Sequence, residues 1–307
     1  MEPHLSEPFA QRMRVNAMLR PTPARGSEVD RPHGGTASAI ADDVTSKTIF
    51  KDREESEFYA QCVRDFLFRH GYELLENKEI VELGVGTGET IVELLKYHDF
   101  AGKINGYEID RASYEYARKV IVDNSVADRY MVINENFFAA VRNAVVGGCV
   151  ISNPPYLPAY ERPAQMPELW GGADGSQVTK KIVECGFEHL ILLVSSFSNP
   201  LSIIEHAVSH GYKVLDFTVR TMRFGIYSSE PKVCERIAQL SSQCEAFVSA
   251  DRYCVAGVAW VKHPDAIDLS SSLARALTSL ASCPEAAQAQ TVMPREAAGE
   301  RDRCANA

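Results

Sequence analysis

The sequence predicts an α/β fold in which a mostly parallel sheet of seven strands is covered by helices on both faces. Short apolar runs alternate along the chain with longer segments whose apolar residues recur at helical spacing. Strands that alternate with helices are joined by right-handed crossovers, which makes the sheet parallel and covers both of its faces. A glycine-rich turn also joins the first run to a helix, where open α/β sheets hold a nucleotide-like ligand.

The expected elements follow one another from residue 54 to residue 261. The last two strands can pair antiparallel at one edge of the sheet, since no helical pattern follows the final strand before Pro264. We expect strands at residues 78–83, 103–109, 130–133, 149–152, 190–194, 213–219 and 254–261. We expect helices at residues 54–68, through Ile91 to Leu95, and at 112–124, 138–145, 176–186, 200–210 and 232–243.

Composition divides the chain into three parts. Residues 1–44 mix Pro, Arg, Glu, Gly and Ala without periodicity, and we expect a mostly disordered leader there. Residues 45–263 carry the expected sheet and form one domain. Residues 264–307 are rich in Ala, Ser and Gln, and we expect a helix at 267–280 followed by a disordered tail.

The overall composition is that of a globular protein, with 45% hydrophobic and 24% charged residues. The formal net charge of -9 counts mildly against a long nucleic acid as partner, because proteins that bind one usually carry a basic face. No apolar run approaches the ~20 residues of a membrane span, and the N-terminus lacks the apolar core of a signal peptide. We therefore expect a soluble, cytoplasmic protein without a membrane partner.

The cysteines and histidines do not indicate a metal site. The eight cysteines include no Cys-x-x-Cys pair and have no histidine at ligand spacing, so we expect reduced thiols. His206 and His210 lie four apart on an expected helix, but without a third ligand nearby we expect no metal there.

Gly84, Gly86 and Gly88 alternate between an expected strand and an expected helix, and Glu82 opens this loop. The spacing departs from the dinucleotide-binding pattern, whose last glycine packs the helix against the strand near a pyrophosphate. The carboxylate of Glu82 disfavours an anion and favours an ammonium or sulfonium. Glu108 ends the second strand, where an acidic residue accepts the two ribose hydroxyls. A ligand with a ribose, a positive centre and no pyrophosphate is implied, which fits S-adenosylmethionine.

A rigid turn follows the strand at 149–152, because Pro154 and Pro155 donate no backbone hydrogen bond and keep the preceding residues extended. The turn presents the amide of Asn153, the carbonyls of Asn153 and Pro154, and the ring of Tyr156. These groups suit a planar group with an NH2, because acceptors take both hydrogens, the ring lies against its face, and the nitrogen lone pair points elsewhere. The sequence therefore predicts a site that positions an amide or aromatic amine for attack on an electrophile.

These segments together resemble the class I methyltransferases that carry Asn-Pro-Pro-Tyr. The resemblance is strongest to the catalytic domain of the release-factor glutamine methyltransferases (the HemK or PrmC family), and more distant to the adenine amino-methyltransferases. It implies a Rossmann-like class I methyltransferase fold for residues 45–263 and S-adenosylmethionine as cofactor. The matching segments are residues 52–57, 82–88, 106–110, 152–156 and 171–175.

The resemblance also implies roles for the site residues. Asn136 stands where the family usually has an aspartate that holds the adenine amino group. The residues expected to bind the cofactor are Glu82, Gly84, Gly86, Gly88, Glu108, Asn136 and Asn153. The expected catalytic residues are Asn153, Pro154 and Tyr156, and those expected to bind the acceptor are Pro155, Tyr156 and Trp170. The loop at 157–174 is long enough to close over the acceptor, and no metal is required.

Three functions remain open. The first is N-methyl transfer to a protein glutamine side chain or to a small-molecule amine; we favour the amine because we do not expect residues 1–44 to form the helical domain of the bacterial enzymes. The second is adenine amino-methylation of RNA or DNA, which the negative net charge of the chain disfavours. The third is a non-catalytic binding or scaffold protein of the same fold, which the loss of Asn153 or of a glycine would have suggested. It ranks last because Asn153 and the glycines are present.

Overall fold

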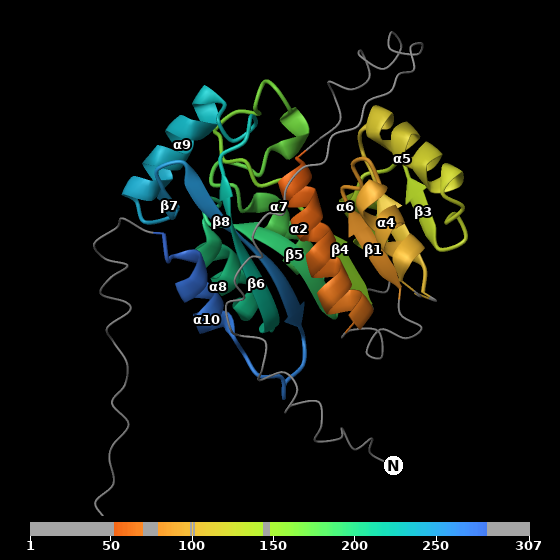
Figure 1. The fold of residues 1–307 in the computed structure, drawn as a ribbon. Coiled ribbons are helices and arrows are strands. Elements are labelled where there is room, and N and C mark those ends of the chain that lie inside the picture. The colour runs from red at the N-terminus through yellow and green to blue at the C-terminus, as the bar shows by residue number, and fades with distance from the viewer. Residues whose placement is uncertain (1–51, 70–78, 99, 101, 144–147, 281–307) are drawn as a thin grey trace, which may run out of the picture. The chain divides into compact units, whose positions relative to one another are not determined.

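The computed structural model describes residues 52–69, 79–98, 100, 102–143 and 148–280 (Figure 1). The expected leader at residues 1–44 and the expected tail after residue 280 lie outside these residues. The division into leader, domain and extension therefore stays a prediction. None of the helices within the described ranges has the length and apolar character needed to cross a membrane.

In the described residues, eight strands form one sheet in the order β3-β2-β1-β4-β5-β8-β6, with β7 paired to β8. Strands β1 to β5 are parallel, and β8 is antiparallel to both β5 and β6. This confirms the predicted α/β fold with a mostly parallel sheet. The strands are β1 (Ile80–Leu83), β2 (Ile104–Tyr107), β3 (Tyr130–Ile133), β4 (Cys149–Ser152), β5 (His189–Ser195), β6 (Lys213–Arg223), β7 (Val248–Ser249) and β8 (Arg252–Val261).

The last two predicted strands, β6 and β8, pair antiparallel at one edge of the sheet. The sequence did not predict that β8 lies between β5 and β6, although the consistent burial of β8 along its length suits a strand with a neighbour on each side. The short strand β7 was also missed, because two residues are too few to leave an alternating pattern.

The predicted helices are present with shifted ends. The first continues as a π-helix, η2 (Arg64–Arg69), and the helix expected at 138–145 is a short α6 followed by a 3-10 turn. The helices are α2 (Arg53–Val63), α4 (Glu89–Tyr97), α5 (Arg111–Asp123), α6 (Phe137–Ala140), η3 (Val141–Asn143), η4 (Pro167–Leu169), α7 (Gln177–Glu184), α8 (Pro200–Ser209), α9 (Pro231–Ser242) and α10 (Ser270–Leu277).

Alternate strand residues face opposite sides of the sheet, and each side packs against its own helices. In β4, Ile151 belongs to one apolar cluster and Val150 to the other; in β5, Ile191 and Leu190 divide in the same way. The first cluster includes residues of α2, α4, α5 and α9, and the second includes residues of α6, α7, α8 and α10. Helices therefore cover both faces, as predicted.

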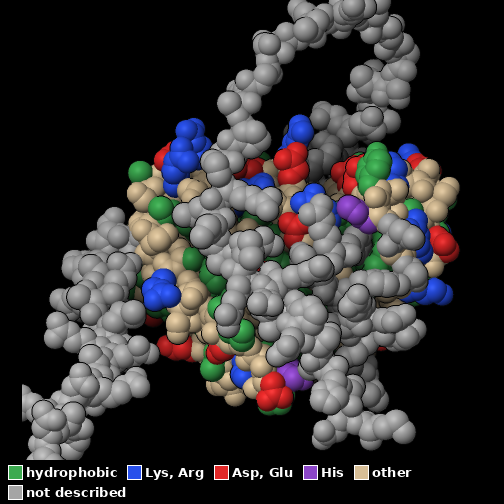
Figure 2. Space-filling view, turned by 60° about the horizontal axis from the view of Figure 1, so that its bottom comes forward, with side chains coloured by type: hydrophobic (Ala, Val, Ile, Leu, Met, Phe, Trp, Pro, Cys, Tyr) green, Lys and Arg blue, Asp and Glu red, His purple; other side chains and the backbone are tan. Residues whose placement is uncertain are grey.

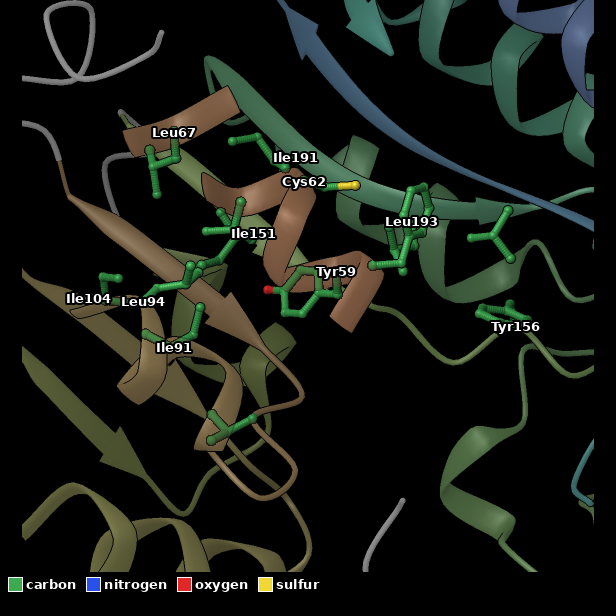
Figure 3. Packing of buried hydrophobic residues seen from close by; sticks show 14 of the residues in the cluster. Tyr59, Cys62, Leu67, Ile91, Leu94, Ile104, Ile151, Tyr156, Ile191 and Leu193 are labelled. Carbon is green, nitrogen blue, oxygen red and sulfur yellow. The ribbon is translucent and has the colours of Figure 1, made fainter. Parts of the chain in front are cut away.

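Helix α2 lies across the first face of the sheet (Figure 1). Figure 3 shows Tyr59 and Cys62 of α2 among Ile151 and Leu193 of the central strands. The helix begins after Asp52, whose side chain accepts the backbone N–H of Glu55 at 3.0 Å. Its first turn thereby comes to lie next to the turn that follows β4.

Candidate active site

A cavity of about 500 Å³ lies at the carboxyl ends of the parallel strands. Small-molecule sites typically enclose roughly 300–1,000 Å³. One part of its wall comes from the glycine loop and the residues after β2 and β3, and another from the turn after β4 and the loop that follows it. The predicted site residues that line it are Gly84, Gly86, Glu108, Asn136, Asn153, Pro154, Pro155, Tyr156 and Trp170. Glu82 and Gly88 are not among the lining residues.

The glycine loop brings bare backbone to the cavity. Gly86 has a φ of 59°, a backbone angle that residues with a side chain rarely adopt. Its N–H donates to Oε2 of Glu108 at 2.9 Å. A Cβ at Gly84 or Gly86 would meet none of the described atoms within 4 Å, so the loop is open on the side where a Cβ would stand. Gly88 is instead the N-cap of α4, and a Cβ there would lie 3.1 Å from that of Ala117 in α5.

The carboxylate of Glu108 lies between the glycine loop and the start of α5. Its two oxygens accept the backbone N–H groups of Gly86 and Asp110, each at 2.9 Å. Burial raises the pKa of Glu108, and these two hydrogen bonds act in the opposite direction. Because each carboxylate oxygen has a second lone pair, Glu108 can still accept hydrogen bonds from a ligand in the cavity.

Glu82 lies beneath the loop rather than on the cavity wall. Its carboxyl group is almost fully buried and is hydrogen-bonded to the hydroxyl groups of Tyr59 and Tyr130. Burial raises the pKa of Glu82 to about 8, so the group is mostly protonated at pH 7. At pH 7 Glu82 therefore carries little of the charge that was expected to favour a cationic ligand, and its contacts tie it to α2 and β3.

Asn136 lies after β3 and lines the cavity beside Phe137 and Phe138. It is also the N-cap of α6, and its side-chain oxygen accepts the N–H of Ala139 at 3.2 Å. The oxygen that was expected to face an adenine amino group is thus partly engaged, with one lone pair left.

The turn after β4 begins at Ser152, whose hydroxyl donates to the carbonyl of Leu83 at 2.8 Å. Asn153 follows, and its Nδ2 donates to Oε1 of Glu55 at 2.5 Å, while the Tyr156 hydroxyl donates to Oε2 of Glu55 at 2.5 Å. The Asn153 Oδ1 is buried and has no hydrogen-bond partner among the described residues. Asn153 lines the cavity, and an unpaired buried acceptor is costly unless a ligand supplies its donor.

The Gly-Gly-x-Asp-Gly segment at 171–175 packs directly on this turn. The N–H of Gly171 donates to the Leu157 carbonyl at 3.0 Å, and the N–H of Ala159 donates to the Gly172 carbonyl at 3.1 Å. Gly175 has a φ of 80°, and a Cβ there would lie 2.5 Å from the carbonyl oxygen of Tyr156. The two segments are therefore held together by backbone contacts that leave no room for a side chain.

The loop at 157–174 is anchored rather than free. The Glu230 carboxylate, at the start of α9, accepts the backbone N–H groups of Ala164 and Gln165 at 2.8 and 3.2 Å. Trp170 donates from Nε1 to the Ala159 carbonyl at 2.8 Å, and the Arg162 guanidinium lies 5.7 Å from its ring centroid. Arg162 and Trp170 both line the cavity.

The rings of His206, in α8, and His210, its C-cap, are tilted by 40° with their centroids 4.2 Å apart. Nε2 of His206 lies 3.3 Å from a carboxylate oxygen of Glu184. Among the residues that the structure describes, no three His, Cys, Asp or Glu side chains gather as metal ligands do.

Sequence reasoning assigned no role to Glu55 or Glu230. Glu55 lies within the segment at 52–57 that resembles the family, which was a signal that the site extends to α2. Its contacts with Asn153 span 98 residues, and no local pattern predicts such a pairing. Glu230 precedes a proline that opens α9, and this identifies a helix start but not the loop that its carboxylate holds.

Comparisons with known proteins agree with the predicted resemblance. No protein-family model matches the chain. The release factor glutamine methyltransferase of Dictyoglomus turgidum is 31% identical, over 53% of this chain and 57% of that protein. The enzyme of the same name from Bradyrhizobium diazoefficiens is 29% identical, over 38% of this chain and 41% of that protein. Over about half of its length, the chain is similar to release factor glutamine methyltransferases.

The match to the release factor glutamine methyltransferases is partial, since the chain spans about half the length of these two relatives. Among solved structures, a putative RNA methyltransferase from Pyrococcus horikoshii is 12% identical with a TM-score of 0.44, over 73% of this chain and 90% of that one. A likeness of that degree supports no inference about activity.

Proposed function

We propose that this protein is an S-adenosylmethionine-dependent N-methyltransferase that methylates a planar amide or amine nitrogen. The observation that carries the proposal is the buried, unpaired Oδ1 of Asn153, a residue that lines the cavity. Because Nδ2 of Asn153 donates to Glu55, the amide oxygen is turned away from Glu55 and is left for a ligand. An NH2 group supplies the donor that this oxygen lacks.

The cofactor half of the cavity fits S-adenosylmethionine. Glu108 has lone pairs left for two ribose hydroxyls, and Gly84 and Gly86 leave the loop open beside it. Phe137 and Phe138 offer an apolar wall for a purine, with Asn136 at its edge. When bound there, the cofactor supplies an electrophilic methyl group.

The acceptor half is built from the turn after β4. Oδ1 of Asn153 and the carbonyl of Pro154 would take the two hydrogens of the target NH2, and the ring of Tyr156 would lie against its plane. This arrangement directs the nitrogen lone pair toward the cofactor half. The nitrogen held by Asn153 and Pro154 would take the methyl group that S-adenosylmethionine supplies and release one proton to water, and the electron pair of the broken carbon–sulfur bond would stay on the cofactor.

The acceptor that we propose first is a protein glutamine side chain, because the two relatives are named for that substrate. A small-molecule amine is the second acceptor of the same class. Pro155 and Trp170 line the acceptor half and would contact either one.

Adenine in RNA or DNA remains the runner-up, with one supporting observation. Arg162 and Trp170 form a basic and aromatic corner of the cavity, as base recognition often uses. The carboxylates of Asp52, Glu55 and Glu168 line the same cavity, however, and would repel a phosphate backbone. On the part of the face in Figure 2 that grey atoms leave visible, basic and acidic side chains are interspersed and form no continuous basic patch.

Transfer of labelled methyl groups tests the proposal. The acceptors are an unmethylated bacterial release factor, an adenine-containing RNA and a panel of primary amines and amides. We expect label on an amide or amine nitrogen, abolished by Asn153→Ala. The matched control is Asn105→Ala, because Asn105 also donates its Nδ2 to a carboxylate, that of Glu79 at 3.0 Å, but on the exposed surface. Label on adenine would favour the runner-up, and equal transfer by both variants would remove Asn153 from the mechanism.

A further inference from the structure

We propose that Glu55 is a positioning residue that fixes which end of the Asn153 amide faces the acceptor. The inference rests on the function proposed above and adds to it a residue of α2. Glu55 is 5% exposed, and its two oxygens accept from Asn153 and Tyr156, one each, at 2.5 Å. A single side chain thereby holds two of the groups that would contact the acceptor.

The chemistry of the amide makes this role necessary. The oxygen and nitrogen of an asparagine side chain have nearly the same shape, so the side chain can turn over at little steric cost. An ionised carboxylate only accepts hydrogen bonds, so it can face the NH2 of Asn153 but not its oxygen. Glu55 therefore leaves Oδ1 of Asn153, which has no partner among the described residues, to accept from a donor on the acceptor.

The position of Glu55 is set by its surroundings. Asp52, the N-cap of α2, accepts the backbone N–H of Glu55, which fixes the first turn of the helix. The charged or titratable groups that face its carboxylate are Tyr156 from the turn after β4, Tyr253 from β8, and Asp52 on its own helix. None of these carries a positive charge, so the hydrogen bonds from Asn153 and Tyr156 are what stabilise the ionised form.

The same surroundings make the arrangement depend on pH. Burial raises the pKa of Glu55 to about 7, although the hydrogen bonds from Tyr156 and Asn153 lower it. A protonated Glu55 carries an O–H, which can donate to Oδ1 of Asn153 and so turn the amide over. Activity that depends on this orientation rises as the pH increases through about 7.

Glu55→Gln is the decisive variant, because its side chain has nearly the same shape but carries its own donor. Its oxygen can accept from Tyr156 while its NH2 donates to Oδ1 of Asn153, which leaves the NH2 of Asn153 facing the acceptor. Two donors would then oppose each other in the site. We expect kcat to fall about 100-fold, as when one oriented hydrogen-bonding group of an active site is removed. The affinity for S-adenosylmethionine should stay within about threefold of wild type, since Glu55 touches the acceptor half only.

The matched control is Glu79→Gln, because Glu79 accepts from Asn105 in the same kind of pair on the surface. With an acceptor found in the transfer assay, wild-type and Glu79→Gln proteins should show a rise of kcat through pH 7, and Glu55→Gln should show a low and flat profile. A Glu55→Gln variant with wild-type kcat and an unchanged pH profile would overturn the proposal.

A second measurement needs no acceptor. The side-chain NH2 signals of Asn153, identified by their loss in Asn153→Ala, should move with a midpoint near pH 7 in ¹⁵N NMR spectra. Tyr156→Phe removes one donor to the carboxylate, so the midpoint should move to higher pH, and in Glu55→Gln the titration should disappear. If the signals titrate but no acceptor is ever methylated, the proposed reaction fails and the pairing stands. If they do not move between pH 5.5 and 9, the role of Glu55 is wrong whatever the reaction.

Discussion

The backbone N–H of Gly86 donates to Oε2 of Glu108 at 2.9 Å, which joins the glycine loop to the end of β2. Because Asp110 donates to the other oxygen, the carboxylate is held by two elements before any ligand arrives. The ribose site that we propose is therefore preformed, and its affinity depends on a carboxylate that only accepts hydrogen bonds.

Glu108→Gln tests this preformed site. One backbone N–H, from Gly86 or Asp110, would then face an NH2, and we expect the dissociation constant for S-adenosylmethionine to rise about tenfold or more. Calorimetry gives the constant. The control is Asp268→Asn, because Asp268 also accepts two backbone N–H groups, those of Val214 and Ser270, away from the cavity. An unchanged affinity in Glu108→Gln would remove Glu108 from the cofactor site.

Gly175→Ala tests the contact between the turn at 171–175 and the backbone of Tyr156. A Cβ at Gly175 would lie 2.5 Å from the Tyr156 carbonyl oxygen. The control is Gly211→Ala. Gly211 has nearly the same φ as Gly175, 84° against 80°, but a Cβ there meets no described atom within 4 Å, so this variant measures the cost of the backbone strain without the steric clash. We expect Gly175→Ala to lose about 2 kcal/mol more of its unfolding free energy in urea titrations. Equal losses of unfolding free energy in the two variants would show that the turn at 171–175 shifts to make room for the Cβ without a further cost.

Local patterns explain how much of this fold was predictable. The turn after β4 was predicted from an apolar run and two prolines, and these act on their immediate neighbours. The strands and helices follow in the same way from spacing within each segment. The position of β8 between β5 and β6 depends instead on which strands lie next to each other, and a buried apolar run carries no information about its neighbours.

Glu230→Gln tests whether the anchored loop supports acceptor binding. One of the N–H groups of Ala164 and Gln165 would face an NH2, which costs ~1–3 kcal/mol and loosens the loop. We expect KM for the acceptor to rise about tenfold while the affinity for S-adenosylmethionine is unchanged. Lys232→Ala is the control, because its ion pair with Glu161 at 2.9 Å joins the same two segments on the exposed surface. If KM for the acceptor rose equally in Glu230→Gln and Lys232→Ala, the cause would be any weakening of the contact between the two segments, and not the loss of the Glu230 hydrogen bonds.

Glu82→Gln tests the protonation of the carboxyl group beneath the glycine loop. Because the folded-state pKa of Glu82 is raised to about 8, the folded protein binds a proton that the unfolded chain has released, and stability falls as the pH rises toward 8. The glutamine side chain in Glu82→Gln does not titrate, so this variant lacks the pH dependence of stability that Glu82 causes. We expect wild type to lose about 2 kcal/mol more unfolding free energy than Glu82→Gln between pH 6 and pH 8.5. Glu89→Gln is the control, since Glu89 accepts from the Tyr116 hydroxyl on the surface. Parallel curves for wild type and Glu82→Gln would mean that Glu82 is ionised throughout.

The candidate site was predicted in its parts but not in its connections. Asn153, Tyr156 and Glu108 were found because each follows a recognisable strand. The surroundings of Glu82 were not predicted, because its partners, Tyr59 and Tyr130, come from α2 and β3; burial raises the pKa of Glu82 although the hydrogen bonds from these two hydroxyl groups lower it. Long-range polar contacts of this kind depend on the packing of the whole sheet, which no short segment records.

A calorimetric titration of S-adenosylmethionine into the purified protein tests the central claim most directly. Gly86→Asp is the control, because it places a charged side chain at a φ of 59° in the wall of the cofactor site. The account predicts micromolar binding by wild type and none by the variant. No heat at several temperatures, together with no thermal shift in the presence of the ligand, would contradict it.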